Sequence, residues 1–227
     1  MTLTRRVVAE AVGTALLLAA VVGSGIMGER LAAGNVAIAL LANTLATGAT
    51  LVALILTFGS ISGAHFNPAV TLADAWQGGI AWRHVPAYLT AQLGGAFAGV
   101  ACAHLMFGEP LIAASRHPRS GGAQMFSEFI ATFGLLSVIW GCTRFRSSMT
   151  AFAVGAYITG AYWFTASTSF ANPAVTLARS ATDTFAGIRP ADVPGFIGAQ
   201  LVGAMAATAL FTGLAPYRAH EETVHGK

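Results

Sequence analysis

The chain has 227 residues, of which 55% are hydrophobic and only 9% are charged, and its formal net charge is +3 at pH 7. A soluble domain carries roughly 25% charged residues, so the composition excludes an ordinary soluble domain and indicates an integral membrane protein. With so few charges, the basic balance gives no reason to expect a nucleic-acid partner.

Six apolar blocks follow one another along the chain. A helix that crosses a bilayer takes about 20 mostly apolar residues, and each block is long enough for this. The first block follows Arg5 and Arg6, but it contains Glu10 and is too long for the apolar part of a secretory signal, so we expect it to be retained as a span. The blocks lie near residues 5 to 27, 33 to 58, 84 to 106, 122 to 142, 148 to 167 and 192 to 214.

Lysine and arginine residues near the ends of these blocks indicate the orientation. If the spans alternate in direction, seven of these residues lie on one side of the membrane and five on the other. Positive residues accumulate on the cytoplasmic side, so we expect both termini in the cytoplasm and the chain in the inner (plasma) membrane. The first group is Arg5, Arg6, Arg83, Arg144, Arg146, Arg218 and Lys227, and the second is Arg30, Arg116, Arg119, Arg179 and Arg189.

A heptapeptide occurs twice. NPAVTLA begins at Asn67 and again at Asn172, 105 positions later, between the second and third spans and between the fifth and sixth. The surrounding spans also repeat, since Glu10 in the first corresponds to Glu128 in the fourth. We therefore predict one channel domain over residues 1–227, made of repeats at about 1–110 and 118–216 and a cytoplasmic tail at 217–227. Because each repeat has three spans, the second must enter the membrane from the opposite side, which gives an inverted repeat.

Each heptapeptide is expected to start a short helix inside the membrane. Asparagine caps free backbone donors and proline suits the first helical position. Such half-helices survive at membrane depth only when they are buried or line a water-filled cavity. Two of them meeting at their N-termini would repel cations, while the asparagine amides could bind a passing neutral solute. The fold predicted is an all-α membrane protein with six transmembrane helices and two re-entrant half-helices, with the pore at Asn67, Pro68, Ala69, Asn172, Pro173 and Ala174.

The chain resembles the major intrinsic protein family, the aquaporins and aquaglyceroporins. The resemblance rests on SGAHFNPAVTLA at residues 62–73, the second NPAVTLA, the paired glutamates and the repeated AQxxGA, and it extends over all six spans. It implies that Glu10 and Glu128 accept hydrogen bonds from the loops that carry the tripeptides, and that the chain forms a homotetramer with one pore per subunit. Because a carboxylate inside a membrane is costly and usually functional, the residues alone leave open a proton-coupled carrier.

The selectivity filter expected from the resemblance departs from the usual family pattern. The family usually has an arginine directly after the second tripeptide, where this chain has Val175, and counting back from the tripeptides gives Thr47, Gly160 and Ser169 as the other three positions. Glycerol facilitators usually have aspartate after that arginine, where this chain has Thr176. The combination is similar to bacterial members associated with arsenic-resistance genes. That subgroup implies passage of arsenite or methylated arsenicals, although the same filter would suit glycerol, urea or water.

Three further residues are candidates for the mouths of the pore. Arg179 follows Val175 by one helical turn and either forms a positive lip at the outer vestibule or pairs with Asp183. Asp74 occupies the matching place in the first repeat and is expected at the cytoplasmic mouth. His65 is either a hydrogen-bonded loop histidine or a pH gate, because histidine titrates near neutrality.

The sequence contains no nucleophile paired with a base, no cluster with metal-ligand spacing and no nucleotide-binding loop. We therefore expect neither an enzyme nor a bound metal or cofactor, and expect small neutral solutes, water and the lipid bilayer as partners. Cys102 and Cys142 are expected to be buried small hydrophobes. A coupled transporter and a non-conducting adhesive protein remain as alternatives.

Overall fold

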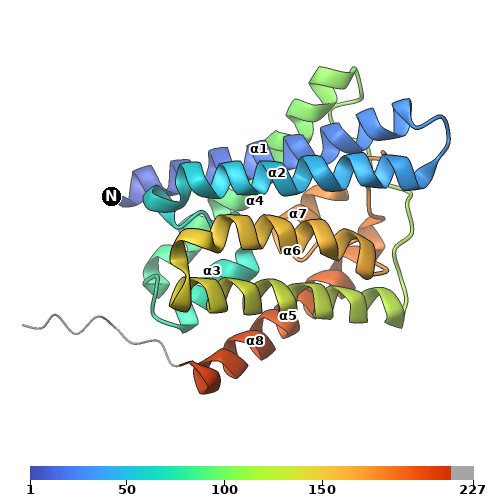
Figure 1. The fold of residues 1–227 in the computed structure, drawn as a ribbon. Helices are drawn as coiled ribbons and strands as arrows, with labels where there is room; N and C mark the ends of the chain where they lie inside the picture. Colours follow the sequence, from blue (N-terminus) through green and yellow to red (C-terminus); the bar gives the residue numbers. More distant parts are fainter. Residues whose placement is uncertain (216–227) are drawn as a thin grey trace, which may run out of the picture.

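The computed structural model describes residues 1–215, so the predicted tail at 217–227 lies outside the described part of the chain. The α-helices and three short 3-10 turns make up its regular structure between these limits (Figure 1). The helices are α1 (Leu3–Leu31), α2 (Val36–Ser62), α3 (Pro68–Trp76), α4 (Val85–Phe107), α5 (Gly122–Phe145), α6 (Thr150–Phe164), α7 (Pro173–Arg179) and α8 (Val193–Leu214).

Six of these helices are the predicted spans. Five of them, α1, α2, α4, α5 and α8, are long and apolar enough to cross a membrane. Helix α6 has 15 residues, about 22 Å of rise, and it follows directly on the 3-10 turn Ser147–Met149. It lies between α2 and α5 in the bundle, in contact with both (Figure 1). The predicted all-α fold of six spans with two half-helices, α3 and α7, is confirmed.

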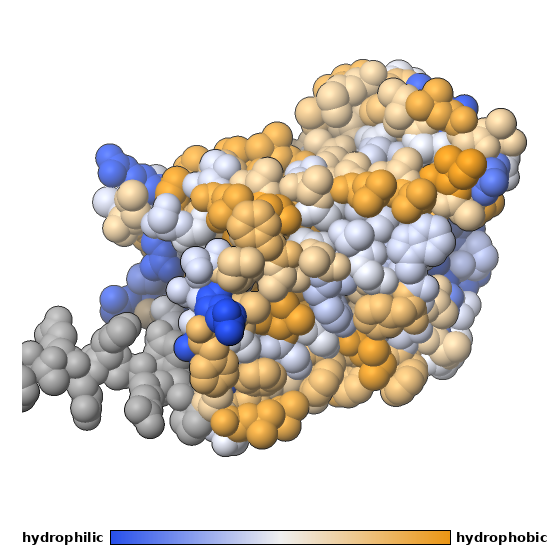
Figure 2. All heavy atoms as spheres, viewed as in Figure 1, coloured by the Kyte–Doolittle hydropathy of each residue, from blue (hydrophilic) through white to orange (hydrophobic). Residues whose placement is uncertain are grey.

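The molecule is apolar on its outer sides, and several polar side chains are buried inside it. Figure 2 shows hydrophobic residues along the sides of the bundle and hydrophilic ones mainly toward the ends of the helices. Broad apolar surfaces of this kind need a partner, which for spanning helices is lipid. Side chains exposed on these surfaces include Leu16, Leu45, Leu56, Phe152 and Leu210, whereas Glu10, Gln92, Glu128, Gln200 and Arg179 are all buried.

The two halves of the chain pack in the same way. Helix α1 contacts α2 and α4, and correspondingly α5 contacts α6 and α8, while α2 and α6 join the halves. Gly95 on α4 lies so close to α1 that a Cβ there would collide with the carbonyl of Ala11, and Gly203 on α8 is as close to the carbonyl of Phe129 on α5. Small residues permit such approaches between membrane helices. The half-helices α3 and α7 each contact both α4 and α8, which holds them inside the bundle.

The cysteines differ from the prediction. Cys102 is exposed and Cys142 is only partly buried. Cys102 lies on α4 between Ala101 and Ala103, and it is Ala103 that faces the core, with no exposed surface. Hydropathy alone could not distinguish the lipid-facing side of this helix from its buried side, because both are apolar.

Candidate functional site

The two half-helices begin at the asparagines of the repeated tripeptides. Asn67 and Asn172 both have extended backbones, and each is followed by proline at the first helical position. The Oδ1 of Asn67 accepts the N–H of Ala69 at 2.9 Å, and the Oδ1 of Asn172 accepts that of Ala174 at 3.0 Å. The side-chain oxygens are therefore used to cap helices, as the sequence predicts.

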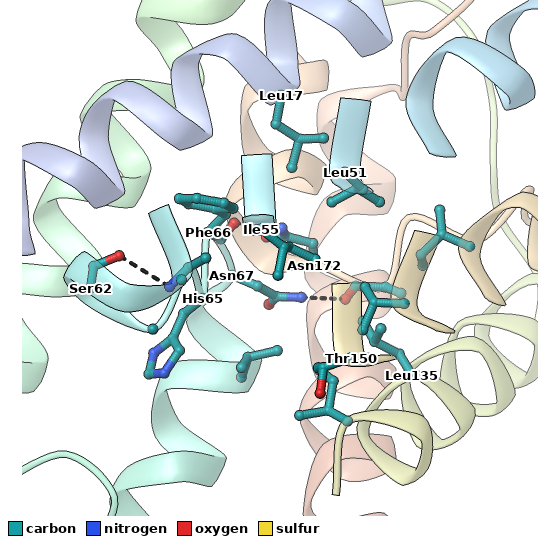
Figure 3. Close-up of a pocket in the computed structure, with 18 of the residues that line it drawn as sticks. Leu17, Leu51, Ile55, Ser62, His65, Phe66, Asn67, Leu135, Thr150 and Asn172 are labelled. Carbon is teal, nitrogen blue, oxygen red and sulfur yellow. Dashed lines mark hydrogen bonds between the residues drawn. The ribbon is translucent and has the colours of Figure 1, made fainter. Parts of the chain in front are cut away.

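The nitrogens of the same amides join the two motifs. The Nδ2 of Asn67 donates to the carbonyl of Ala171, and the Nδ2 of Asn172 donates to the carbonyl of Phe66, both at 2.8 Å (Figure 3). A carboxamide nitrogen carries two hydrogens, so each asparagine keeps a second N–H after this bond. Both asparagines line a cavity, and within residues 1–215 each Nδ2 has only the one protein acceptor.

The cavity has a volume of about 550 Å³ and passes both tripeptides. Because α3 and α7 begin at the bonded asparagines and run away from each other, their C-terminal ends mark opposite ends of the cavity (Figure 1). Close to the tripeptides the walls are largely apolar, with Leu17, Leu51, Ile55 and Leu135 near the asparagines (Figure 3). We call the two ends the α7 end, lined by Thr47, Tyr162, Ser169, Val175 and Arg179, and the α3 end, lined by Met1, Arg6, His65, Asp74 and Thr150.

A buried glutamate holds the loop before each half-helix. Glu10 accepts the backbone N–H groups of His65 at 3.0 Å and Phe66 at 2.7 Å. Glu128 accepts those of Phe170 and Ala171, both at 2.8 Å. Both glutamates are fully buried, and neither is among the described residues that line the cavity. This is the geometry that a loop-bracing role requires.

A glutamine completes each of these networks. Gln92 on α4 donates to Glu10 at 2.8 Å, and Gln200 on α8 donates to Glu128 at 2.6 Å. Each also lies within hydrogen-bond distance of a threonine on a half-helix, at 2.9 Å and 2.7 Å respectively. The glutamines of the repeated AQxxGA pattern therefore connect a long helix, a carboxylate and a half-helix in each half of the chain.

The braced loops have an irregular backbone at matching positions. Ala64 and Phe66 have φ values of 50° and 49°, and Ser169 and Ala171, each 105 residues later, have values of 50° and 48°. A non-glycine residue in this left-handed region costs on the order of 1 kcal/mol or more, and it persists where surrounding contacts hold it. The backbone bonds to the two glutamates are such contacts.

Three of the four predicted filter residues line the α7 end, and the fourth does not. Thr47, Ser169 and Val175 are there, whereas Gly160 is exposed on the outside of the bundle, where an added Cβ would meet nothing within 4 Å. Helix α6 presents Tyr162 to the cavity instead, with its hydroxyl 3.3 Å from the Oγ1 of Thr47. Counting back from the tripeptide gave the wrong residue because residues 165–172 form an irregular loop, across which helical register is lost.

Tyr162 could have been found from the spacing of α6. The helix turns Val154, Ile158 and Tyr162 toward the cavity, each four residues after the last, which is the spacing of one helical face. Aromatic residues in a span more often serve packing or the membrane interface than line a pore, so aromatic character alone does not point to Tyr162.

Arg179 lines the α7 end and is almost fully buried. Its Nε donates to the carbonyl of Ala186, and its Cζ lies 3.4 Å from the centroid of the Phe170 ring. Asp183 pairs with Arg116 instead, at 2.7 Å. The proposed alternative of a pair between Arg179 and Asp183 is therefore wrong.

The partner of Asp183 lies on a distant loop. The backbone N–H and guanidinium of Arg116 hold the pKa of Asp183 below its ordinary value. Arg116 belongs to the connection between α4 and α5, so this ion pair ties that connection to the loop after α7.

The α3 end brings together an acid and a histidine. The Nε2 of His65 lies 3.6 Å from the Oδ2 of Asp74, and its Nδ1 is 3.0 Å from the Oγ1 of Thr71. Both ring nitrogens of His65 therefore face polar partners within the same repeat. Arg6 lines this end too and donates to the hydroxyl of Tyr88 at 2.7 Å.

Comparison with known proteins identifies the family. The family described as Major intrinsic protein matches residues 1–150. The chain belongs to the major intrinsic protein family. The aquaglyceroporin AqpS of Rhizobium meliloti (strain 1021) is 58% identical over 212 residues, which cover 93% of this chain and 91% of that protein. The probable aquaporin NIP7-1 of Arabidopsis thaliana is 35% identical over 159 residues, which cover 68% of this chain and 57% of that protein.

A solved structure shows the same fold. The aquaglyceroporin from Plasmodium falciparum is similar with a TM-score of 0.73 over 92% of this chain and 96% of that one, at 23% identity. The family resemblance seen in the sequence is thus confirmed, and this member of the major intrinsic protein family is an aquaglyceroporin-type channel. The family consists of channels for small neutral solutes and water, so this member is a transporter and not an enzyme.

Proposed function

We propose that this channel conducts compact uncharged polar solutes larger than water, with trivalent metalloid hydroxides such as arsenite, or methylated arsenicals, as its cargo. The observation that carries the proposal is the composition of the α7 end, where Val175 stands directly after the second tripeptide and three hydroxyl groups line the same section. An undissociated metalloid hydroxide is a small neutral polyol, which hydroxyl groups can bind in place of water.

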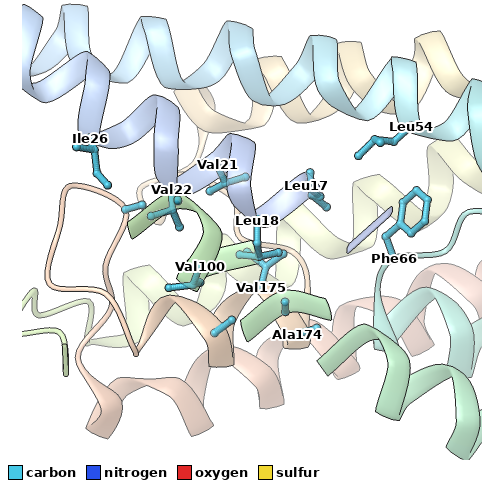
Figure 4. Packing of buried hydrophobic residues seen from close by; sticks show 14 of the residues in the cluster. Leu17, Leu18, Val21, Val22, Ile26, Leu54, Phe66, Val100, Ala174 and Val175 are labelled. Carbon is cyan, nitrogen blue, oxygen red and sulfur yellow. The ribbon is translucent and has the colours of Figure 1, made fainter. Parts of the chain in front are cut away.

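The α7 end has a free hydroxyl that suits such a solute. Ser169 is 3% exposed, and within residues 1–215 its Oγ has no hydrogen-bond partner. Because Ser169 lines the cavity, this hydroxyl is open to water or solute there, and a solute hydroxyl can take the place of that water. Val175 supplies an uncharged surface in the same section, beside Leu17, Leu18 and Val21 of α1 (Figure 4).

The two glutamates buried among the spans do not suit a proton-coupled carrier. Glu10 and Glu128 accept hydrogen bonds from backbone and glutamine donors, and both lie outside the set of cavity-lining residues. A proton relay needs acids that the transported species can reach. Passive conduction is therefore the mechanism that we propose.

We further propose the arrangement of the channel in the membrane. The chain is a single channel domain of two inverted repeats, at about residues 1–110 and 118–216, which the paired hydrogen-bond networks support. It forms a homotetramer in the inner membrane with both termini in the cytoplasm, so that the α7 end faces outward and the α3 end, with Asp74 and His65, faces the cytoplasm. The excess of lysine and arginine on the side of the termini supports this orientation.

Swelling of proteoliposomes in arsenite, methylated arsenicals, glycerol, urea and water tests the cargo. Arsenite or methylarsenicals should enter at least as fast as glycerol. If water alone enters, the proposal fails.

The substitution Val175→Arg tests the filter. A guanidinium at this position would narrow the pore, so entry of glycerol and arsenite should fall by about tenfold, or about 1.4 kcal/mol of barrier, while water entry is retained. Val175→Leu, which adds bulk without charge or donors, is the matched control and should have the smaller effect. Unchanged solute entry in Val175→Arg would show that the constriction lies elsewhere.

A further inference from the structure

The channel lacks an arginine next to its second tripeptide, but a guanidinium lines the same end of the cavity one turn further along α7. Arg179 follows Val175 by four residues, and both side chains line the cavity. Four residues of helix rise by about 6 Å. The charge therefore lies beyond the uncharged constriction and not within it.

The guanidinium is held in a fixed place. Arg179 is 2% exposed, its Nε donates to the carbonyl of Ala186, and its Cζ lies 3.4 Å from the centroid of the Phe170 ring. The backbone N–H of Phe170 is in turn bound by Glu128 at 2.8 Å. Within the described part of the chain, the bond from Nε is the one hydrogen bond that this guanidinium makes, so its other donors remain available toward the cavity.

The acids of the neighbouring loops are already engaged elsewhere. Asp183 pairs with Arg116 at 2.7 Å, and Asp192 pairs with Arg189 at 2.8 Å. Arg119 adds a second guanidinium 5.0 Å from the ring centroid of Phe170. Two guanidinium groups therefore lie at the Phe170 ring, and Glu128, which accepts the backbone N–H of Phe170, balances only one of these positive charges. The side chains around the ring carry a net positive charge.

From this geometry we propose that Arg179 determines the charge selectivity of the channel. Arginine stays protonated in proteins, and a fixed charge in a water-poor passage acts far more strongly than in bulk water. Arg179 repels cations and protons at the α7 end, while the constriction below it stays wide and neutral. The inference rests on the proposed function. Under it, solutes are selected by size at the constriction around Val175 and by charge at Arg179, one helical turn further along α7.

Proton leak through proteoliposomes tests this role, measured with a pH-sensitive dye under an imposed pH gradient. The variants Arg179→Gln and Arg179→Met remove the charge, and the second keeps an apolar stem against Phe170. The proton leak of a variant is compared with that of the wild type when the two proteins have the same thermal midpoint in detergent. The control Arg146→Gln removes a charge from an exposed arginine after α5, which does not line the cavity.

The wild type and Arg146→Gln should leak protons no faster than empty liposomes. The neutral Arg179 variants should leak about tenfold faster, which is about 1.4 kcal/mol of lost barrier, while still passing glycerol. Adding Val175→Arg to Arg179→Gln should restore the barrier. A leaky wild type, or neutral variants that pass glycerol without leaking protons, overturns the inference. Absence of neutral-solute entry in the wild type would instead refute the proposed function, because the two readouts are separate.

Discussion

Two hydroxyl groups at the α7 end differ in what they already bind. Thr47 lies 3.3 Å from the hydroxyl of Tyr162, so both of these side chains have a polar neighbour. Ser169 has none within residues 1–215. A solute hydroxyl can therefore bind Ser169 without breaking a protein hydrogen bond, and we expect solutes to pause at this residue.

The register of α6 gives a prediction for two residues. Tyr162 lines the cavity and Gly160 faces outward, so Tyr162→Ala should widen the α7 end enough to admit polyols longer than glycerol. Gly160→Trp should leave glycerol entry within about twofold of the wild type, because a difference below about 0.4 kcal/mol is expected for a side chain outside the pathway. Swelling assays with polyols of increasing length measure both. Blocked glycerol entry in Gly160→Trp would contradict this assignment.

Local chemistry made some of these residues predictable and left others open. Asparagine capping and proline at the first helical position depend on adjacent residues, so the sequence placed Asn67 and Asn172 correctly. Arg179 could not be resolved from the sequence, since the partner of Asp183 turned out to be Arg116, 67 residues earlier in the chain. That Tyr162 lines the cavity, and not the predicted Gly160, likewise depended on the path of the loop between α6 and α7.

At the scale of elements, each half-helix follows a loop in which non-glycine residues adopt the unfavourable left-handed conformation. The loops contain left-handed residues at matching positions, and Glu10 or Glu128 binds two successive backbone N–H groups in each. The repeat and the six spans were evident from the sequence because periodicity and hydropathy report them directly. The left-handed backbone was not evident, because alanine, phenylalanine and serine do not indicate it.

Replacing Glu128 by glutamine tests the brace. A glutamine keeps one acceptor oxygen but turns an NH₂ group toward donors, so at least one backbone N–H becomes unpaired. This should lower the free energy of unfolding by about 1–3 kcal/mol and reduce the thermal midpoint by roughly 2–4 °C per kcal/mol. Thermal scans in detergent measure it. Glu29→Gln, at an exposed site on α1, should leave the midpoint unchanged, and an equally stable Glu128→Gln would refute the bracing role.

At the scale of the whole molecule, one chain contains a complete cavity. Residues of α1, α2, α5 and α6 and of both half-helices line it, while the outer surface is apolar (Figure 2). The cavity is lined by both tripeptides and by residues of both half-helices, and the proposed passive conduction needs no alternation between states that open to opposite sides.

Solute entry should therefore rise in proportion to concentration. Equal gradients should give equal inward and outward rates, and an imposed proton or sodium gradient should not change them. Stopped-flow swelling and shrinking of the same proteoliposomes measure both directions. Saturation at low concentration, or acceleration by a proton gradient, would identify a coupled carrier.

The two bonds between the asparagine motifs also bear on how the protein is made. Asn67 donates to Ala171, and Asn172 donates to Phe66, so neither bond can form until the ribosome has synthesised about 105 further residues after the first motif. During that interval the motif at Asn67 can be held by Glu10 and Gln92, but the motif at Asn172 has not yet been made. The contact between the two motifs is thus completed only by the last third of the polypeptide, and a chain released before that point lacks both of these bonds.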